Sequence, residues 1–452
     1  MTALSGAVTA LVGDGAGGRA GGYGRIDRFL ADNQDLDTPF LVVDLDIVRD
    51  RYDELRRALP QAAVYFAVKA NPDPAVVGLL AALGSNFDVA SLGEIDLCLD
   101  LGINPNRLSY GSTIKKERDI SAAYERGVHT FAVDSAPELD KIVKHVRHGT
   151  VLVRLASDGA GADWPLSRKF GCNPAEARLL LRAAADHGLS VGVCFHVGSQ
   201  QRDPQAWNGP LSTVAELAAW LDRAGHRLST LNLGGGLPST YLLPTPTIDS
   251  YGTQIDIALK RHLGNAHGMA VMVEPGRYLV GDSGVIRAEV VLIADKASDA
   301  GRRWVYLDIG MFNGLAETQD EAIRYRIRCP GRHGQSVPSV LAGPTCDSLD
   351  VLYERAPYPL PIDLQVGDQV EVLSTGAYTS SYSSIWFNGI EPLRSYHLPA
   401  TVHGENHEPI PTVPSLGRHT DRLPAPGRHH PAPGSSVTCT CTERAGSSHS
   451  PS

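Results

Sequence analysis

Strand-like apolar segments alternate with stretches of helical spacing through the middle of the chain, and this alternation restricts the fold more than any other feature. The helical stretches include residues 47–59, 74–83, 92–101, 136–146, 174–185 and 211–224. Strands that alternate with helices form parallel sheets, and eight strands predict a closed (β/α)8 barrel, an α/β fold. The eight strand-like segments are residues 64–69, 87–91, 108–111, 130–135, 151–155, 191–199, 231–236 and 271–277.

Polar residues or glycines stand at the carboxyl end of nearly every predicted strand. In a barrel these ends converge on one mouth, where catalytic groups lie. We therefore expect one site there, built from Lys69, Asp88, Arg154, His196, Ser199, Gly234–Gly236, Glu274 and Arg277.

The pattern changes after about residue 280. Strand-like segments at 285–295, 304–307, 339–342 and 369–374 are separated by Gly/Pro turns, without helices of comparable length. This predicts a second, mostly antiparallel β domain over residues 279–399, after a barrel over residues 46–278. We expect residues 25–45, which include the apolar segment Phe40–Asp44, to add strands to that β domain.

Both ends of the chain differ from the middle in composition. Residues 1–24 are rich in Gly and Ala, and residues 400–452 hold eight prolines and six histidines. Such segments bury too little apolar surface to offset the entropy of ordering, so we expect both to be disordered. Cys439 and Cys441 supply only two metal ligands, which favours an exposed tail over a metal site.

Overall composition excludes several classes of protein. The 41 Lys+Arg against 50 Asp+Glu give a net charge of −9, which argues against a basic nucleic-acid-binding protein. No apolar run approaches the roughly 20 residues of a membrane helix, and the first residues do not resemble a secretion signal. Seven scattered cysteines without a CxxC pair indicate reduced thiols and a cytoplasmic protein without a structural zinc site.

Two features at the predicted mouth suggest a bound aldehyde and a phosphate. Lys69 lies in an apolar segment, where desolvation lowers the pKa of its amine and allows a Schiff base with an aldehyde cofactor. The alternative is a lysine at the edge of the core, paired with a carboxylate. Gly234–Gly236 expose backbone N–H groups that can bind a phosphate, or they form a tight turn.

Three residues at the ends of the later barrel strands could serve the same cofactor. Glu274 could pair with a pyridinium nitrogen, and Arg277 could hold a phosphate. His196 could stack on a planar ring, although a core histidine bonded to the backbone is the alternative.

The β domain contributes candidates of its own. Cys346 and Asp347 lie in a turn-rich Gly-Pro segment, which favours an exposed functional loop as much as a buried thiol. Tyr378 follows a strand, where its phenol could reach a phosphate or pack in the core.

Together these residues resemble the ornithine/diaminopimelate/arginine decarboxylase family, pyridoxal-phosphate enzymes with a barrel like that of alanine racemase. The matching motifs occur in the family's order and spread over about residues 40–390. They are AVKAN (67–71), FDVAS (87–91), FHVGS (195–199), GGG (234–236), EPGR (274–277), GPTCD (343–347) and GAY (376–378).

The resemblance implies a role for each matching residue. Lys69 would hold pyridoxal phosphate as a Schiff base, Glu274 would keep the pyridine nitrogen protonated, and His196 would stack on the ring. Cys346 would return a proton to the α-carbon after CO2 leaves. The phosphate would be held by Ser199, Gly235, Gly236, Arg277 and Tyr378, with Asp88 and Arg154 as supporting groups.

The resemblance also bears on assembly and substrate. In the family, the cysteine and the acid after it come from the partner subunit, which implies a head-to-tail homodimer with shared active sites. Cys346-Asp347 resembles ornithine and lysine enzymes, whereas diaminopimelate enzymes have Cys-Glu-Ser. Asp347 would meet the distal ammonium, and Glu317 or Asp320 would be the second acid. This favours ornithine as the substrate, with putrescine for polyamine biosynthesis as the product; lysine stays open.

Other functions remain as alternatives. A related decarboxylase could act on lysine, diaminopimelate or a specialised-metabolite amino acid. A non-catalytic regulatory homologue would be expected to lack the cofactor lysine or the proton donor, and both are present here. A phosphate-binding barrel without pyridoxal phosphate would not explain Lys69, Glu274 and Cys346 together. A racemase would share the barrel and Lys69, but the Cys346 loop favours decarboxylation.

Overall fold

The structure is a computed structural model that describes residues 22–165, 169–264 and 268–401. The sequence predicts disorder for residues 1–24 and 400–452, of which residues 1–21 and 402–452 lie outside the described residues. The prediction was wrong at residues 23 and 24, since Tyr23 bonds to Oγ of Ser374 and Gly24 begins a helix. Among the helices of the described ranges, none combines the length and the apolar character that a membrane crossing needs.

All eight predicted barrel strands form and close into a parallel barrel, which confirms the predicted fold class. The barrel closes where Val271 of the last strand pairs with Ala62 of the first. In chain order the strands are β2 (Ala62–Ala67), β3 (Asn86–Val89), β4 (Leu108–Tyr110), β5 (Thr130–Val133), β6 (Thr150–Arg154), β8 (Ser190–Cys194), β10 (Leu228–Asn232) and β11 (Ala270–Val273).

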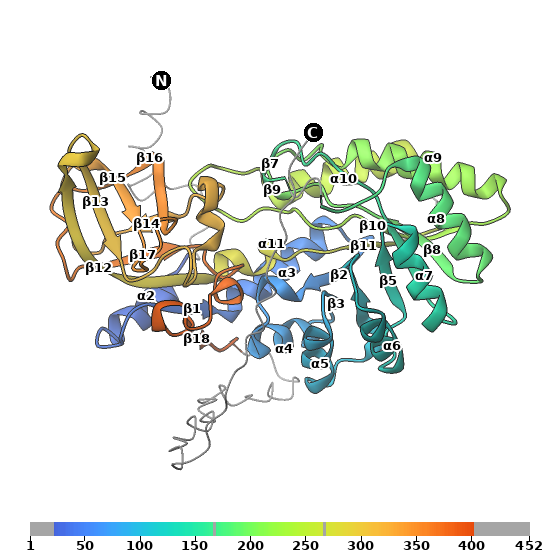
Figure 1. Cartoon of the computed structure of the whole chain (residues 1–452), viewed down its shortest axis with the longest axis horizontal. Coiled ribbons are helices and arrows are strands. Elements are labelled where there is room, and N and C mark those ends of the chain that lie inside the picture. Colours follow the sequence, from blue (N-terminus) through green and yellow to red (C-terminus); the bar gives the residue numbers. More distant parts are fainter. Residues whose placement is uncertain (1–21, 166–168, 265–267, 402–452) are drawn as a thin grey trace, which may run out of the picture. The chain divides into compact units, whose positions relative to one another are not determined.

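Helices surround the barrel strands (Figure 1). Their starts follow from the sequence. Asp73 caps the second of them and Asn173 forms a capping box with Glu176, each just before a proline in the first turn. The helices are α3 (Leu45–Ala58), α4 (Pro74–Ala82), α5 (Leu92–Asp100), α6 (Glu117–Glu125), α7 (Ala136–His145), α8 (Pro174–Asp186), α9 (Asn208–Arg223) and α10 (Ile248–Leu263).

The second part of the chain forms one eight-stranded sheet of order β14-β17-β12-β13-β15-β16, with β1 beside β12 and β18 beside β1. The pairs are antiparallel except β13–β15 and β1–β18, so the sheet is mostly antiparallel, as predicted. The strands are β1 (Phe40–Asp44), β12 (Gly284–Lys296), β13 (Arg302–Leu307), β14 (Arg326–Arg328), β15 (Ser336–Ala342), β16 (Val351–Pro361), β17 (Gln369–Leu373) and β18 (Arg394–Leu398).

The segment that precedes the barrel differs from its prediction in one element. Residues 25–45 contain the strand β1, which joins the large sheet, but α2 (Gly24–Asp32) comes before it. Ile26 and Leu30 of this helix are fully buried against the outer side of β1. Ile26, Phe29 and Leu30 recur at helical spacing, which places them on one face of the helix.

Short helical turns connect the barrel to the sheet. The helix α11 (Arg277–Val280) follows β11 directly, and the turn η3 (Gly281–Ser283) leads into β12.

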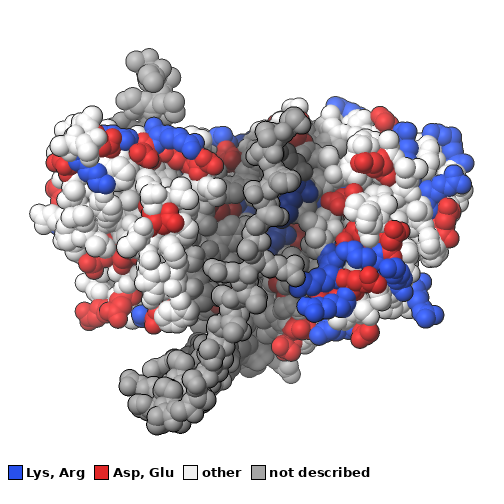
Figure 2. All heavy atoms as spheres, viewed as in Figure 1, with Lys and Arg blue, Asp and Glu red and all other residues white. Residues whose placement is uncertain are grey.

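The surface of the described residues carries both signs of charge: Figure 2 shows acidic and basic side chains interspersed over the face in view.

Candidate active site

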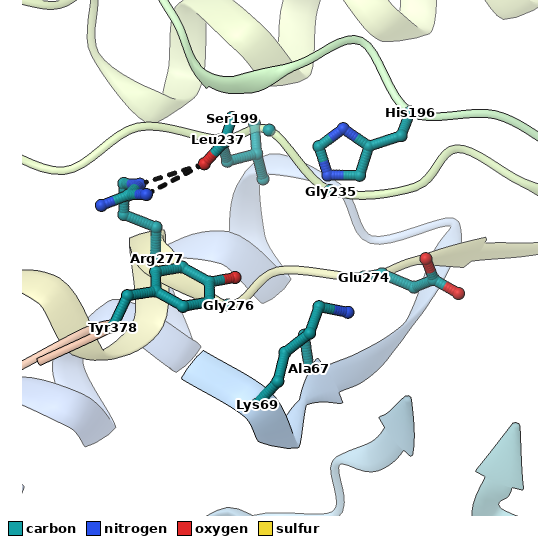
Figure 3. A pocket seen from close by; sticks show the side chains of 11 residues that line it. Ala67, Lys69, His196, Ser199, Gly235, Leu237, Glu274, Gly276, Arg277 and Tyr378 are labelled. Carbon is teal, nitrogen blue, oxygen red and sulfur yellow. Dashed lines mark hydrogen bonds between the residues drawn. The ribbon is translucent and has the colours of Figure 1, made fainter. Parts of the chain in front are cut away.

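A pocket lies at the carboxyl ends of the barrel strands, where they approach the large sheet (Figure 3). It brings together eight of the residues that the sequence analysis selected, from five separate segments of the chain. Its lining consists of Ala67, Lys69, His196, Ser199, Gly235, Gly236, Leu237, Glu274, Gly276, Arg277 and Tyr378.

Lys69 points its amine into the pocket (Figure 3). The strand β2 ends at Ala67, two residues earlier than the predicted strand, and Lys69 lies in the short turn η1 (Val68–Ala70). Its Nζ donates a hydrogen bond of 2.8 Å to Oδ2 of Asp88, at the end of the neighbouring strand β3. The amine is therefore held between two adjacent strand ends.

The pKa of Lys69 differs in direction from the sequence-based expectation. Desolvation alone lowers this pKa, but the negative charges of Asp88 and Glu274 outweigh it, and the pKa of Lys69 is raised. The amine is protonated in the ligand-free chain, so it must lose a proton before it can act as a nucleophile. The expectation of a lowered pKa was wrong, whereas the alternative weighed from the sequence, a lysine paired with a carboxylate, is the arrangement that the structure has.

Asp88 keeps one oxygen without a partner. Its Oδ1 is buried and makes no hydrogen bond, while Oδ2 binds Lys69. Gly111, after β4, leaves the space for this oxygen, since a Cβ atom there would lie 2.0 Å from it. A buried carboxylate oxygen without a donor is ready to accept a hydrogen bond from a ligand.

Glu274 follows β11 and faces the same pocket. Burial and the nearby charge of Asp88 raise the pKa of this carboxyl to about 7. Nδ2 of Asn232, the last residue of β10, donates a 2.5 Å hydrogen bond to Oε1 of Glu274, and Oδ1 of Asn232 accepts from the backbone N–H of Gly234. Asn232 thus positions both the carboxyl group and the start of the glycine run.

His196 is the planar group of the pocket. Burial and the positive charges of Arg154 and Lys69 lower its pKa to about 3, so the ring is neutral near pH 7. Its Nδ1 accepts a 3.1 Å hydrogen bond from the backbone N–H of Gly198, which places the ring proton on Nε2. A neutral ring in fixed orientation suits stacking on an aromatic ligand.

Donors for an anion gather at the end of the pocket that carries Arg277. Nε and Nη2 of Arg277 donate to Oγ of Ser199 at 3.2 and 3.0 Å, as Figure 3 shows. The backbone of Gly235 and Gly236 also lines the pocket, with Gly235 beside His196, and Gly236 has a φ of +114°, which disfavours any larger residue. Hydroxyl, guanidinium and backbone N–H groups form the donor set that a phosphate requires.

Tyr378 joins this end of the pocket from the large sheet. Its ring lies under the guanidinium of Arg277, 4.9 Å from Cζ to the centroid. Its backbone N–H donates to the carbonyl of Ala70 at 2.8 Å, and Nδ2 of Asn71 donates to the carbonyl of Gly376 at 2.9 Å. These two bonds join the lysine turn to the segment that carries Tyr378.

Asp282, which the sequence analysis did not select, binds two segments that lead to the Arg277 end of the pocket. Its Oδ1 accepts from the backbone N–H of Thr240 at 3.0 Å and from Oγ of Ser374 at 2.9 Å. Thr240 follows the glycine run and Ser374 precedes Tyr378, so one carboxylate ties both segments together. No sequence signal pointed to Asp282, whereas Asn232 stands at a strand end like the residues that were selected.

Cys346, Asp347 and Asp320, three predicted residues of the sheet domain, do not line the pocket. Cys346 is exposed, and its backbone N–H donates to Oδ1 of Asn388. Oδ1 of Asp347 accepts from the backbone N–H of Leu349, while exposed Asp320 pairs with Arg355 at 2.6 Å.

Glu317 and Arg154 take other positions. Both oxygens of Glu317 bind the guanidinium of Arg277, behind the pocket. Arg154 ends β6, and its guanidinium lies over the ring of Phe170, 4.7 Å from the centroid.

The comparisons with known proteins agree with this geometry. Residues 45–281 match the family described as pyridoxal-dependent decarboxylase, pyridoxal binding domain. The lysine/ornithine decarboxylase of Selenomonas ruminantium is 37% identical over 359 residues, 78% of this chain and 87% of that protein. The chloroplastic ornithine decarboxylase of Nicotiana glutinosa is 33% identical over 372 residues, 79% of this chain and 83% of that protein.

A solved structure shares the fold. The lysine/ornithine decarboxylase of Vibrio vulnificus, complexed with putrescine, superimposes with a TM-score of 0.72 at 32% identity. The superposition covers 82% of this chain and 98% of the Vibrio chain.

Proposed function

This chain belongs to the family of pyridoxal-dependent decarboxylases, and from that membership we propose that it converts L-ornithine to putrescine and CO2. The coarser activity follows from the family itself: the chain is a pyridoxal-phosphate-dependent decarboxylase of a basic amino acid. The observation that supports ornithine is the Cys346-Asp347 pair, whose carboxylate suits a distal ammonium group.

The pocket fits pyridoxal phosphate group by group. It offers an amine for the aldehyde, a carboxyl group for the pyridine nitrogen, a neutral imidazole for the ring face and several donors for the phosphate. The unpartnered Oδ1 of Asp88 adds an acceptor beside the amine. When bound, pyridoxal phosphate supplies the electron sink for the pair of electrons left behind as CO2 departs.

The residues of the chain bind and orient the cofactor and accept or hold protons in this proposal. Lys69 would hold the cofactor through its aldehyde group, and Asp88, 2.8 Å from the amine, is placed to accept the proton that Lys69 must lose first. Glu274, with a pKa of about 7, would hold the pyridine nitrogen and supply a proton there. His196 and the donors around Arg277 fix the ring and the phosphate in place.

The proton for the product comes from Cys346 of a second copy of the chain in this proposal. Cys346 is exposed and does not line the pocket of its own chain. Exposed apolar side chains lie in the same and the adjoining segments, with Leu349 68% and Trp386 58% exposed. An exposed apolar patch around a reactive thiol fits a subunit interface, so we propose a homodimer with shared active sites.

Asp347 would meet the distal ammonium of the substrate from the same partner loop. Within the chain, both oxygens of Glu317 are engaged by Arg277 and Asp320 is paired on the surface, which favours Asp347 as the main acid. Lysine is the second candidate substrate, because the relative from Selenomonas is named for both amino acids. One methylene changes binding by only about 1–3 kcal/mol, so the two substrates compete closely.

The free thiols of Cys98, Cys172, Cys194, Cys329 and Cys346 suit a reducing compartment, and we place the enzyme in the cytoplasm on that ground. Putrescine made there would feed polyamine biosynthesis.

Initial rates of CO2 release test the proposal. The purified protein, loaded with pyridoxal phosphate, is assayed with ornithine, lysine, arginine and diaminopimelate beside Lys69→Ala. We expect putrescine from ornithine, and no product from Lys69→Ala. Turnover of lysine alone contradicts ornithine as the substrate and supports the same decarboxylation mechanism with lysine. Turnover of diaminopimelate with ornithine inert, or turnover of none of the four, contradicts the proposal.

A further inference from the structure

Arg277 is paired with a buried carboxylate on the side away from the pocket. Nη2 of Arg277 donates to Oε1 of Glu317 at 2.6 Å, and Nη1 donates to Oε2 at 2.7 Å. The side chains of Arg277 and Glu317 are 2% and 6% exposed. Glu317 lies in the turn η5 (Ala316–Glu321), after β13 of the large sheet.

The remaining N–H groups of Arg277 are also engaged. Nη1 donates to Oη of Tyr241 at 2.8 Å, while Nε and Nη2 donate to Oγ of Ser199. The guanidinium is therefore held from three sides, and its Ser199 side is the one that borders the pocket (Figure 3). Because Arg277 and Glu317 are opposite charges in direct contact, their charges cancel while no phosphate is bound.

We propose that Glu317 is the counter-ion of Arg277 in the cofactor-free chain, and that it limits how tightly the chain holds the phosphate of its cofactor. The inference rests on the proposed role of Arg277 in phosphate binding. A buried arginine without a counter-ion is strongly destabilising, so Glu317 stabilises the chain before the cofactor arrives. The phosphate, with close to two negative charges at pH 7, then meets a neutral pair instead of a free cation.

The consequence for affinity follows from a thermodynamic cycle. Replacing Glu317 by glutamine leaves Arg277 uncompensated in the cofactor-free chain, and the bound phosphate restores the compensation. The substitution therefore destabilises the cofactor-free form more than the cofactor-bound form. Since affinity is the difference between these two forms, the Glu317→Gln variant must bind the phosphate more tightly.

The sign of this effect separates the proposal from a purely geometric role. If Glu317 only fixed the orientation of Arg277, its loss would disorder the guanidinium and weaken phosphate binding. If Glu317 instead bound the distal ammonium of the substrate, its loss would raise the KM for the amino acid and leave cofactor affinity unchanged.

Titration of the cofactor-free Glu317→Gln protein with pyridoxal phosphate tests the proposal. We expect a dissociation constant about tenfold below that of the wild type, and a lower thermal midpoint in the absence of cofactor. Inorganic phosphate should raise the midpoint of the variant more than that of the wild type. Pyridoxal, which lacks the phosphate, should bind both proteins equally.

A second buried pair provides the matched control. Nη2 of Arg287 and Oε1 of Glu371 lie 2.8 Å apart within the large sheet, and both side chains are 6% exposed. The other oxygen of Glu371 also pairs with Arg328 at 2.6 Å, so Glu371→Gln removes two ion pairs far from the phosphate. Glu371→Gln should lower the thermal midpoint by the same amount with and without pyridoxal phosphate. Its affinity for the cofactor should stay at the wild-type value, since no phosphate replaces the missing charge.

A dissociation constant of Glu317→Gln equal to or above the wild-type value overturns the proposal. Should the cofactor-free variant fail to fold, protein purified with pyridoxal phosphate gives the same test, because its cofactor must then leave more slowly than from the wild type. Arg277→Met tests the role of Arg277 in phosphate binding separately from the effect of Glu317 on cofactor affinity. If it binds pyridoxal phosphate as tightly as the wild type, the role of Arg277 itself fails; if it binds weakly while Glu317→Gln does not tighten, only the present inference fails.

Discussion

The Nζ atom of Lys69 lies 2.8 Å from Oδ2 of Asp88, and the other oxygen of this carboxylate has no hydrogen-bond partner. The pair keeps the nucleophilic amine protonated and stored in one orientation until a cofactor arrives. The same carboxylate that raises the pKa of the amine is the nearest acceptor for its proton. We therefore expect Asp88 to control the protonation of Lys69.

The Asp88→Asn substitution should shift the pH dependence of cofactor uptake to lower pH. Without the negative charge at Asp88 the pKa of Lys69 falls, because the largest interaction that raises it is lost while desolvation still lowers it, and more of the amine is neutral at a given pH. The measurement is the rate at which visible absorbance develops after cofactor-free protein and pyridoxal phosphate are mixed, over roughly pH 6 to 11, a range that includes the ordinary lysine pKa of about 10.4.

Asp96→Asn is the control for this experiment. Asp96 pairs with Arg126 on the barrel surface at 2.7 Å, and its side chain is 47% exposed. Loss of the Asp96 charge should leave the rate of cofactor uptake with the same pH dependence as in the wild type. A profile for Asp88→Asn that coincides with the wild type would show that Asp88 does not control the protonation of Lys69.

The contribution of Glu274 to the stability of the cofactor-free protein should fall as pH rises from about 4.5 to about 7. The pKa of Glu274 is raised by burial to about 7, so the folded chain keeps a proton that the unfolded chain loses near pH 4.5. This contribution is fully present below the unfolded pKa and is lost as pH rises through the folded one. Glu274→Gln should lack the loss, which amounts to roughly 1–3 kcal/mol.

Urea unfolding of both cofactor-free proteins at several pH values gives the comparison. The quantity of interest is the free energy of unfolding of the wild type minus that of Glu274→Gln. Equal pH dependence in the two proteins would place the pKa of Glu274 in its ordinary range and refute the prediction.

Gly276→Ala should weaken the binding of pyridoxal phosphate. A Cβ atom at this position would lie 2.9 Å from Oη of Tyr378 and 2.9 Å from Cβ of Ala70. Overpacking of this kind costs roughly 1–3 kcal/mol, and if the cofactor-bound form carries this cost the affinity falls by about 5- to 150-fold. The dissociation constant from absorbance titration measures the effect.

Gly78→Ala controls for the added methyl group. Gly78 lies in α4 with nothing within 4 Å of a built Cβ, and alanine favours a helix. This variant should bind the cofactor like the wild type and be at least as stable. Equal affinity of Gly276→Ala and the wild type would mean that Tyr378 is not fixed where the structure has it.

Lys69→Ala and Cys346→Ala should complement each other when mixed. Each variant alone should lack decarboxylase activity, because one lacks the cofactor lysine and the other the proton donor. If each site takes Lys69 from one subunit and Cys346 from the other, exchange of subunits restores about a quarter of the wild-type sites. Putrescine formation after subunit exchange is the measurement.

Subunit exchange with Leu349→Asp in both variants provides the negative control, since a charge at this exposed apolar position should prevent association. Sedimentation reports the association directly. Full activity of Cys346→Ala alone, or no recovery in a mixture that does exchange subunits, would argue against shared sites.

The barrel was predictable from the sequence because its strands are short apolar runs with polar residues at one end. Two of its helices, α6 and α10, were not predicted. α6 buries only Ile120 and Ala123, and α10 contains Gly252, whose built Cβ would lie 2.3 Å from the carbonyl oxygen of Ala58. In α10 the glycine lowers the helical signal, yet it is what lets the helix pack closely against α3.

The large sheet was predictable in part. β16 was missed because it contains three prolines, Pro357, Pro359 and Pro361, and proline normally argues against a strand. It pairs with β15 alone in the sheet order, so it is an edge strand, where a missing N–H is tolerated. β18 was missed because it pairs in parallel with β1, more than 300 residues earlier, which no local pattern reveals.

The pocket was predictable where residues stand at strand ends, as Lys69 and Glu274 do. Long-range contacts escaped prediction, because Glu317 and Asp282 meet their partners only in the folded chain. The pKa of Lys69 escaped for the same reason. Spacing identified which groups the pocket contains, whereas their protonation states depend on distances that only the structure supplies.

The hydrogen bond from Asn71 to the carbonyl of Gly376 spans 305 positions of the chain, and the bond from Tyr378 to Ala70 lies beside it. A barrel produced without the sheet would therefore have the lysine but lack the tyrosine and the contacts that hold the lysine turn. Colour from bound pyridoxal phosphate is thus a folding probe for the whole of residues 22–401. In a refolding reaction it should develop only with the last, slowest phase, after helical signal has already returned.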